Sequence, residues 1–198
     1  MSSNAPDSRS PIRLFPEAEQ VGGNMTDSIV IADTGRLRMR GFQPADIGAL
    51  SKILADAGVM RFSLHGPYST EKTRDFIAAN RACQAERDFA LWALEDRAHG
   101  VLLGFCGLSQ TELNGRQEIE LGYRLARRAW GTGLATEAAS AALRYGFEQC
   151  GLDSIIAIVD IGHRASARVA QKTGMRREAR SRYHDSTIDI YRRHNGLK

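Results

Sequence analysis

The segment from Gln117 to Asp160 most constrains the fold, because three hydrophobic patterns follow one another in a fixed order. "QEIELGYRL" alternates polar and apolar residues, which predicts a strand with one polar face. "RRAWGTGLATEA" then supplies two glycines one residue apart and the start of an alanine-rich helix, and "DSIIAIVD" follows as a buried strand. The order of strand, glycine loop, helix and strand predicts an α/β sheet.

The segments before this one predict a strand in residues 35–42 and helices in residues 43–58 and 69–86. For the second helix we expect Ser69 or Thr70 as the N-cap. Its expected buried stripe consists of Phe76, Ala79, Ala82 and Cys83. Two strands, "FALWALE" and "VLLGFCGLSQ", come next, and the Asn-Gly pair in "ELNGR" predicts a tight hairpin into the strand that carries Glu118 and Glu120.

After the central segment we expect a short helix closed by Gly174, and then two strands around a turn near His184 and Asp185. The complete order is βααβββαβαββ. It predicts a mixed, mostly antiparallel seven-stranded sheet with about four helices, of the α/β (α+β) class. We expect the sheet to splay where the strand with Glu120 meets the strand that ends at Asp160.

The N-terminal segment is rich in Ser, Pro, Gly and Asn and lacks the charged and apolar regions of a secretory signal. We therefore expect a disordered tail over residues 1–32 and a single domain over residues 33–198. Translation could start at either Met1 or Met25.

The cysteines and histidines predict no structural metal or disulfide. Cys83, Cys106 and Cys150 are odd in number, far apart and outside any Cys-x-x-Cys pair, and the histidines have no metal-ligand spacing. No apolar run approaches the roughly 20 residues of a membrane span. We therefore expect a cytoplasmic protein without metal or membrane contacts.

The basic residues are concentrated in the C-terminal part of the chain. The whole chain has a net charge of +4, and residues 120–198 hold 14 Lys and Arg against 8 Asp and Glu. Such an excess fits nucleic acid, a polyanionic small cofactor, or a solvated basic face that binds nothing.

The glycine loop is compatible with few phosphate-binding motifs. A Walker A loop requires Gly-Lys-Ser or Gly-Lys-Thr, which is missing from this segment. A dinucleotide fold requires a third glycine where Thr136 stands, although Asp160 ends the next strand as a ribose-binding acid would. The strand before the loop is half polar and ends five residues before Gly131, which counts against that fold.

A diphosphate-binding loop fits better, with Arg128, Gly131 and Gly133 in the register Arg-x-x-Gly-x-Gly. Successive backbone N–H groups and a helix N-terminus would then face the two phosphates, and the glycines would let them approach the backbone.

The run "WGTGLATEAASAALRYGF", the strand that ends in "IVD" and the segment "HRASARVAQKTGM" together resemble the GNAT superfamily of acetyl-CoA-dependent N-acetyltransferases. The branch that they resemble is that of the ribosomal-protein N-alpha-acetyltransferases, of the RimJ/RimL type. More loosely, "TGRLRMRGFQPADIGAL" and "IELGYRL" are similar to earlier parts of that fold. The resemblance extends over roughly Thr34 to Arg193.

The resemblance implies a coenzyme A site around the glycine loop. The amides from about Ala129 to Ala135, with Arg128 and the Thr136 hydroxyl, would hold the diphosphate. The backbone of Tyr123 to Leu125 would pair with the pantetheine, with the Leu125 N–H as an oxyanion donor. The full set of expected cofactor-binding residues is Tyr123, Leu125, Arg127, Arg128, Ala129, Trp130, Gly131, Thr132, Gly133, Leu134, Ala135, Thr136, His163, Ser166 and Lys172.

His163 stands where the family has an asparagine that contacts the pantetheine. Glu120 is our candidate for the general base, acting through a water, with a solvent-facing strand carboxylate as the alternative. Where many family members have an acidic tyrosine this chain has Ala170, so Ser166 is the candidate acid, with helix N-capping as the alternative. Phe62, His65 and Tyr68 are candidates for the acceptor wall, with simple packing as the alternative.

The expected function is direct acetyl transfer from acetyl-CoA to a primary amine, such as a protein N-terminal α-amine. The alternatives are N-acetylation of a small molecule (an antibiotic, a polyamine or an amino acid), a non-catalytic CoA-binding sensor and a dinucleotide-dependent oxidoreductase. We expect an amine acceptor and a homodimer as partners, and no nucleic acid.

Overall fold

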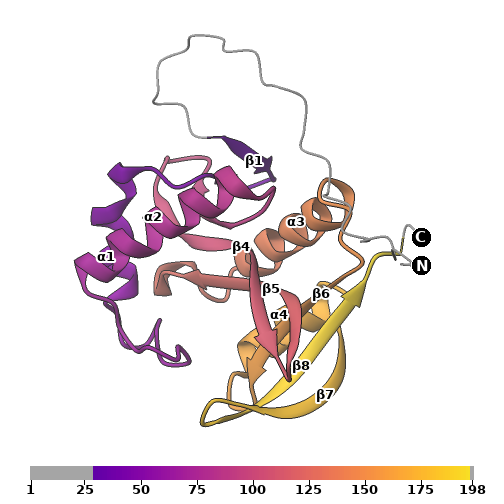
Figure 1. Cartoon of the computed structure of the whole chain (residues 1–198). Helices are drawn as coiled ribbons and strands as arrows, with labels where there is room; N and C mark the ends of the chain where they lie inside the picture. Colours follow the sequence, from indigo (N-terminus) through magenta and orange to yellow (C-terminus); the bar gives the residue numbers. More distant parts are fainter. Residues whose placement is uncertain (1–28, 197–198) are drawn as a thin grey trace, which may run out of the picture.

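The computed structural model describes residues 29–196 and shows one sheet with helices on both faces (Figure 1). Its strands are β1 (Val30–Asp33), β2 (Leu37–Arg40), β3 (Leu91–Asp96), β4 (Leu102–Leu113), β5 (Arg116–Leu125), β6 (Ser154–Asp160), β7 (Arg176–Tyr183) and β8 (Ser186–His194). Its helices are η1 (Pro44–Asp46), α1 (Ile47–Leu54), α2 (Thr70–Glu86), η2 (Arg127–Ala129), α3 (Leu134–Glu148) and α4 (Arg164–Lys172).

The predicted fold class and element order are confirmed, but the predicted strand number is wrong. The sheet of the described residues has eight strands, because β1 pairs antiparallel with β2 ahead of the expected first strand. Residues 30–32 fall in the predicted disordered tail, and that prediction is wrong for them. They form a strand because Ile31 and Ala32 pack against the core. The rest of the predicted tail, residues 1–28, lies outside the described residues.

The strands run in the order β1-β2-β3-β4-β5-β6-β8-β7, and every neighbouring pair is antiparallel except β5 and β6. These two strands are parallel because the crossover through α3 returns the chain in the same direction. They meet at a single bridge, Glu120 opposite Ile156, and diverge beyond it. The expected splay is therefore present, and it opens beside the last residues of β5.

Two hydrophobic cores, one on each face of the sheet, determine the face to which each side chain of β5 points. Leu121 and Leu125 pack into the core under α3 and α4. Another core lies under α1 and α2 on the opposite face. Because side chains alternate along a strand, Glu120, Gly122 and Arg124 point to the α1 and α2 side.

Helix α2 begins as predicted, with Ser69 as the N-cap accepting from the Lys72 N–H at 3.2 Å. Its predicted buried stripe is partly wrong, since Ala79 and Ala82 are exposed whereas Thr73 and Ile77 are buried. The helix is rotated because Asn80 joins it to β3, where the Asn80 Oδ1 accepts from the Leu91 N–H at 3.0 Å.

The Asn114–Gly115 hairpin is confirmed, with both φ angles positive (53° and 75°), as a type I′ turn requires. Within residues 29–196, the structure contains no helix both long and apolar enough to cross a membrane.

Candidate functional site

The glycine loop presents a row of unbonded amides at the start of α3. Gly131 and Gly133 have φ angles of 75° and 84°, in the left-handed region that glycine adopts without strain. Within the described chain, none of the backbone N–H groups from Gly131 to Thr136 donates to a protein acceptor, and the next amide, that of Glu137, bonds to the Gly133 carbonyl at 3.1 Å. A Cβ on Gly131 would have no neighbour within 4 Å. This donor set fits a diphosphate.

The loop is held in place by the turn between β1 and β2. The Glu137 carboxylate accepts from the Thr34 Oγ1 at 2.6 Å, the Arg36 N–H at 2.9 Å and the Arg36 Nε at 2.8 Å. The Arg36 Nη1 also donates to the Thr132 carbonyl at 2.9 Å. Burial acts to raise the pKa of Glu137, but the bonds from Thr34 and Arg36 keep it below its ordinary value. The sequence analysis missed this anchor.

We expect a Glu137→Ala variant to lose about 1 to 3 kcal/mol of unfolding free energy, because Thr34 and Arg36 lose their shared acceptor. Chemical denaturation measures this loss. Hydrogen exchange should show faster exchange of the Gly131–Thr136 amides. Glu148→Ala, at the exposed end of the same helix, is the control and should change neither quantity. Equal stability of the two variants would contradict the anchoring role.

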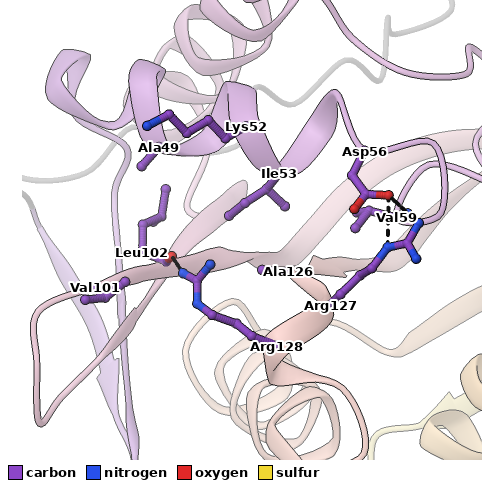
Figure 2. Close-up of a pocket in the computed structure, with 10 residues that line it drawn as sticks. All are labelled: Ala49, Lys52, Ile53, Asp56, Val59, Val101, Leu102, Ala126, Arg127 and Arg128. Carbon is purple, nitrogen blue, oxygen red and sulfur yellow. Dashed lines mark hydrogen bonds and ion pairs between the residues drawn. The ribbon is translucent and has the colours of Figure 1, made fainter.

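Arg127 and Arg128 both extend toward α1 (Figure 2). Arg127 pairs with Asp56 at 2.7 Å and lies over the Trp130 ring, while the Arg128 Nη2 donates to the Leu102 carbonyl at 2.7 Å. With Lys52 of α1 they line a cavity of about 380 Å³. The contact of Arg127 and Arg128 with a diphosphate stays a prediction.

The edge of β5 that faces the gap is open beyond the bridge. The Ala126 N–H donates to the Leu103 carbonyl at 2.8 Å, so the pairs Gly104–Leu125 and Cys106–Tyr123 are the non-hydrogen-bonded pairs of this antiparallel ladder. The backbone groups of Tyr123 and Leu125 therefore point away from β4 and toward the gap. The Leu125 carbonyl is used by the Trp130 Nε1 at 2.7 Å, which leaves the Leu125 N–H directed into the gap.

Glu120 lies at the bridge itself, on the α1 and α2 side. Burial raises the pKa of its carboxyl to about 7, against the opposing effects of the Ile158 N–H bond and the nearby Arg124 charge. A carboxylate with this pKa exchanges a proton near neutral pH, as a general base must. Glu120 is half-buried, and its role as a general base stays a prediction.

Ser166 and Tyr123 form a hydroxyl pair on the other face of the sheet, with their oxygens 2.8 Å apart. Burial raises the pKa of Tyr123 to about 12. The N-cap of α4 is His163, whose Nδ1 accepts from the Ser166 N–H at 3.4 Å. The N-capping alternative for Ser166 is thus wrong. The sequence analysis missed the Tyr123 hydroxyl because the two residues are 43 positions apart.

His163 is a half-buried residue at the N-terminus of α4. Its ring stacks on Phe62 with centroids 4.2 Å apart. Burial, followed by the Arg124 and Arg61 charges, lowers the pKa of His163 against the pull of Asp160. With Nδ1 accepting, the Nε2–H is the available donor of the ring.

The remaining expected site residues are more dispersed. Tyr68 lies near enough to Arg124 to interact with it electrostatically. His65 is exposed and, with Tyr68, lines a separate surface hollow along α2. Lys172 is exposed in the last turn of α4, at the opposite end of the helix from His163. Arg124, which no sequence signal singles out, interacts electrostatically with Tyr68, Glu120 and His163. Within residues 29–196, no group of His, Cys, Asp and Glu side chains has a metal-site geometry.

Comparisons with known proteins agree on one family. The family described as "Acetyltransferase (GNAT) domain" matches residues 36–176. The uncharacterized protein YkkB of Bacillus subtilis (strain 168) is 35% identical over 161 residues, covering 81% of this chain and 93% of YkkB. The uncharacterized N-acetyltransferase YnaD of the same organism is 31% identical over 145 residues, covering 73% of this chain and 82% of YnaD.

Among solved structures, RimL, a ribosomal L7/L12 alpha-N-protein acetyltransferase in complex with coenzyme A, superposes with a TM-score of 0.72. The match covers 86% of this chain and 100% of that one, at 17% identity, so it is a likeness of fold.

Proposed function

Because this chain belongs to the GNAT family of acetyltransferases, we propose that it transfers the acetyl group of acetyl-CoA to a primary amine. The acceptor is a protein N-terminal α-amine or the amine of a small molecule. One observation carries the proposal: Glu120, a carboxyl whose burial raises its pKa to about 7, lies at the β5–β6 bridge, and the chain continues from the end of β5 into the amide row of the glycine loop. An anion-binding loop, together with a base whose pKa lies near neutral pH, suits acyl transfer from a phosphorylated cofactor to nitrogen.

The cofactor side of the site is built from backbone groups. The amides of Gly131 to Thr136, at the N-terminus of α3, bind the diphosphate. The open backbone edge of Tyr123 and Leu125 takes up an extended ligand as an added strand would. When bound, acetyl-CoA supplies an activated acetyl thioester. The Leu125 N–H stabilises the negative charge that develops on a carbonyl oxygen during attack.

On the acceptor side, Glu120 removes a proton from the incoming amine. An ammonium group cannot attack, so a base whose pKa is close to ambient pH increases the reactive fraction. An α-amine, with an ordinary pKa near 8, requires little help, whereas a lysine near 10.4 requires more. The hydroxyl pair of Ser166 and Tyr123 is the proton source for the leaving thiolate, since Tyr123 stays protonated at neutral pH.

The fold likeness to RimL supports a protein N-terminus as the acceptor. The small-molecule alternative has an apolar ring as a candidate wall, since Phe62 stacks on His163 with the ring centroids 4.2 Å apart.

A ligand-dependent thermal shift tests the proposed cofactor. We expect acetyl-CoA at about 100 times its dissociation constant to add roughly 2.7 kcal/mol of stability, which raises Tm by several degrees. NAD, NADP and ATP are the controls and should give no comparable shift. Stabilisation by NAD and none by acetyl-CoA would favour the oxidoreductase alternative. Stabilisation by acetyl-CoA without turnover of any amine would favour the sensor.

A further inference from the structure

Among the residues that the structure describes, Arg124 differs from the other buried or partly buried arginines in forming no ion pair. Of the described arginines, four are buried or partly buried: Arg38, Arg40, Arg124 and Arg192. Three of them form ion pairs, namely Arg38 with Asp33, Arg40 with Asp46 and Glu95, and Arg192 with Glu118 and Glu178. Within residues 29–196, Arg124 has no carboxylate within 4 Å.

The contacts of Arg124 leave most of its donors unused. The Nη1 donates to the Val59 carbonyl at a long 3.4 Å, and the guanidinium has five N–H donors in all. Burial lowers the pKa of Arg124 against the attraction of Tyr68 and Glu120, and the group stays charged. Shielding a cation from water without a partner is costly, so a protein keeps one where a ligand provides the counter-charge.

The strand places this cation in line with the base. Glu120, Gly122 and Arg124 follow one another on one face of β5, and Gly122 contributes no side chain between them. The Leu91 side chain packs over Gly122 on this face, since its Cδ2 would lie 3.3 Å from an added Cβ. Glu120 and Arg124 lie on either side of this contact and interact electrostatically.

Glu120 and Arg124 lie on the acceptor side of the proposed site. The Leu125 side chain packs under α3, so that of Arg124, one residue earlier, faces α1 and α2. The amide row of the glycine loop is at the N-terminus of α3. Arg124 is thus oriented toward the amine that Glu120 serves.

Building on the proposed function, we propose that Arg124 binds a carboxylate of the acceptor, and that the acceptor is an amine with a carboxylate close to the reacting nitrogen. A free α-amino acid has this chemistry, and so does a polypeptide N-terminus with an acidic side chain at its second position. The planar guanidinium matches a carboxylate with two parallel hydrogen bonds.

The test compares acceptors that differ only in this charge. One arm uses C-terminally amidated tripeptides that begin Ser-Asp or Ser-Asn, and the other uses the common free L-amino acids and their carboxamides, with CoA release measured at about pH 8.5, where α-amines are largely neutral. In one of the arms we expect wild type to prefer the anionic members by about 10- to 100-fold in kcat/KM. The arm that shows the preference identifies the source of the carboxylate.

Arg124→Gln should reduce this preference to less than about twofold through the KM of the acceptor, and Arg124→Lys should restore part of it. The KM of acetyl-CoA should stay unchanged. Arg116→Gln, which removes an exposed arginine from the same strand, is the matched control and should keep the full preference. The Tm of Arg124→Gln should stay close to that of wild type, because Arg124 forms no ion pair, and its pH–rate profile should show whether loss of the Arg124 charge raises the pKa of Glu120.

Three results would overturn the inference: an undiminished charge preference in Arg124→Gln, a raised KM for acetyl-CoA in place of the acceptor, or no acetylation of any anionic acceptor by a wild type that acetyl-CoA stabilises. Failure of acetyl-CoA to stabilise the wild type would instead reject the proposed function, and the inference with it.

Discussion

A Glu120→Gln variant is expected to lower kcat by about 100-fold or more while leaving the dissociation constant of acetyl-CoA unchanged. The amide has the size of the carboxyl and can still accept from the Ile158 N–H, but it cannot take a proton. For the wild type, kcat/KM should rise with pH through about 7, because the base works in its deprotonated form. The variant should lose this rise. Steady-state kinetics and calorimetric titration with acetyl-CoA measure both effects.

The same substitution should stabilise the protein above pH 7. The folded pKa of Glu120 is raised from 4.5 to about 7, so ionisation favours the unfolded chain and stability is lost as pH rises through that window. Removing the charge should then recover on the order of 2 to 3 kcal/mol at pH 8.

Glu118→Gln is the control for this substitution. The Arg192 hydrogen bonds hold the pKa of Glu118 below its ordinary value, against the effect of burial, so this variant should lose stability at pH 8 and keep its turnover. Equal kcat in wild type and Glu120→Gln would remove Glu120 from the mechanism.

A Gly131→Asp variant is expected to weaken acetyl-CoA binding by about 100-fold or more, because a carboxylate would stand beside the amides that bind the diphosphate. Gly131 has a φ of 75°, which also disfavours any side chain. Calorimetric titration measures the loss.

Gly131→Asn separates charge from backbone conformation. Asparagine and aspartate are similar in size and tolerate the left-handed region to a similar extent, and they differ in charge. We expect the asparagine variant to bind acetyl-CoA distinctly better than the aspartate variant, and the difference to shrink at high salt. If both variants lost the same affinity for acetyl-CoA, the backbone conformation at residue 131, and not repulsion between the carboxylate and the diphosphate, would explain the loss.

Most of the fold could be predicted from the sequence, because its signals are local. The Asn114–Gly115 turn, the Ser69 N-cap and the order of the elements each depend on residues that are neighbours in the chain. β1 was missed because four residues next to a polar segment give too short a pattern. The stripe of α2 was misplaced because Asn80, a polar residue, turns the helix toward β3.

The site could be predicted only where it is continuous in sequence. The glycine loop is one run of residues, and its geometry agrees with the expected cradle. The Arg36–Glu137 anchor and the Tyr123–Ser166 pair join residues 101 and 43 positions apart, and nothing local signals either contact. Arg124 looks like one more charge of a basic region, and its isolation is visible only when the partners of every shielded arginine are compared.

The single bridge between β5 and β6 also has a mechanical consequence. The sheet consists of two blocks, β1 to β5 and β6 to β8, which share a single backbone bridge. Side-chain contacts also join the blocks, among them the Glu118–Arg192 ion pair and the Thr111–Tyr183 hydrogen bond. A ligand that hydrogen-bonds to the open edge of β5, as an added strand would, makes the junction between β5 and β6 more rigid. We therefore expect the two blocks to twist against each other more freely before acetyl-CoA binds than after it. Each catalytic cycle then includes a more rigid and a more flexible state of the sheet.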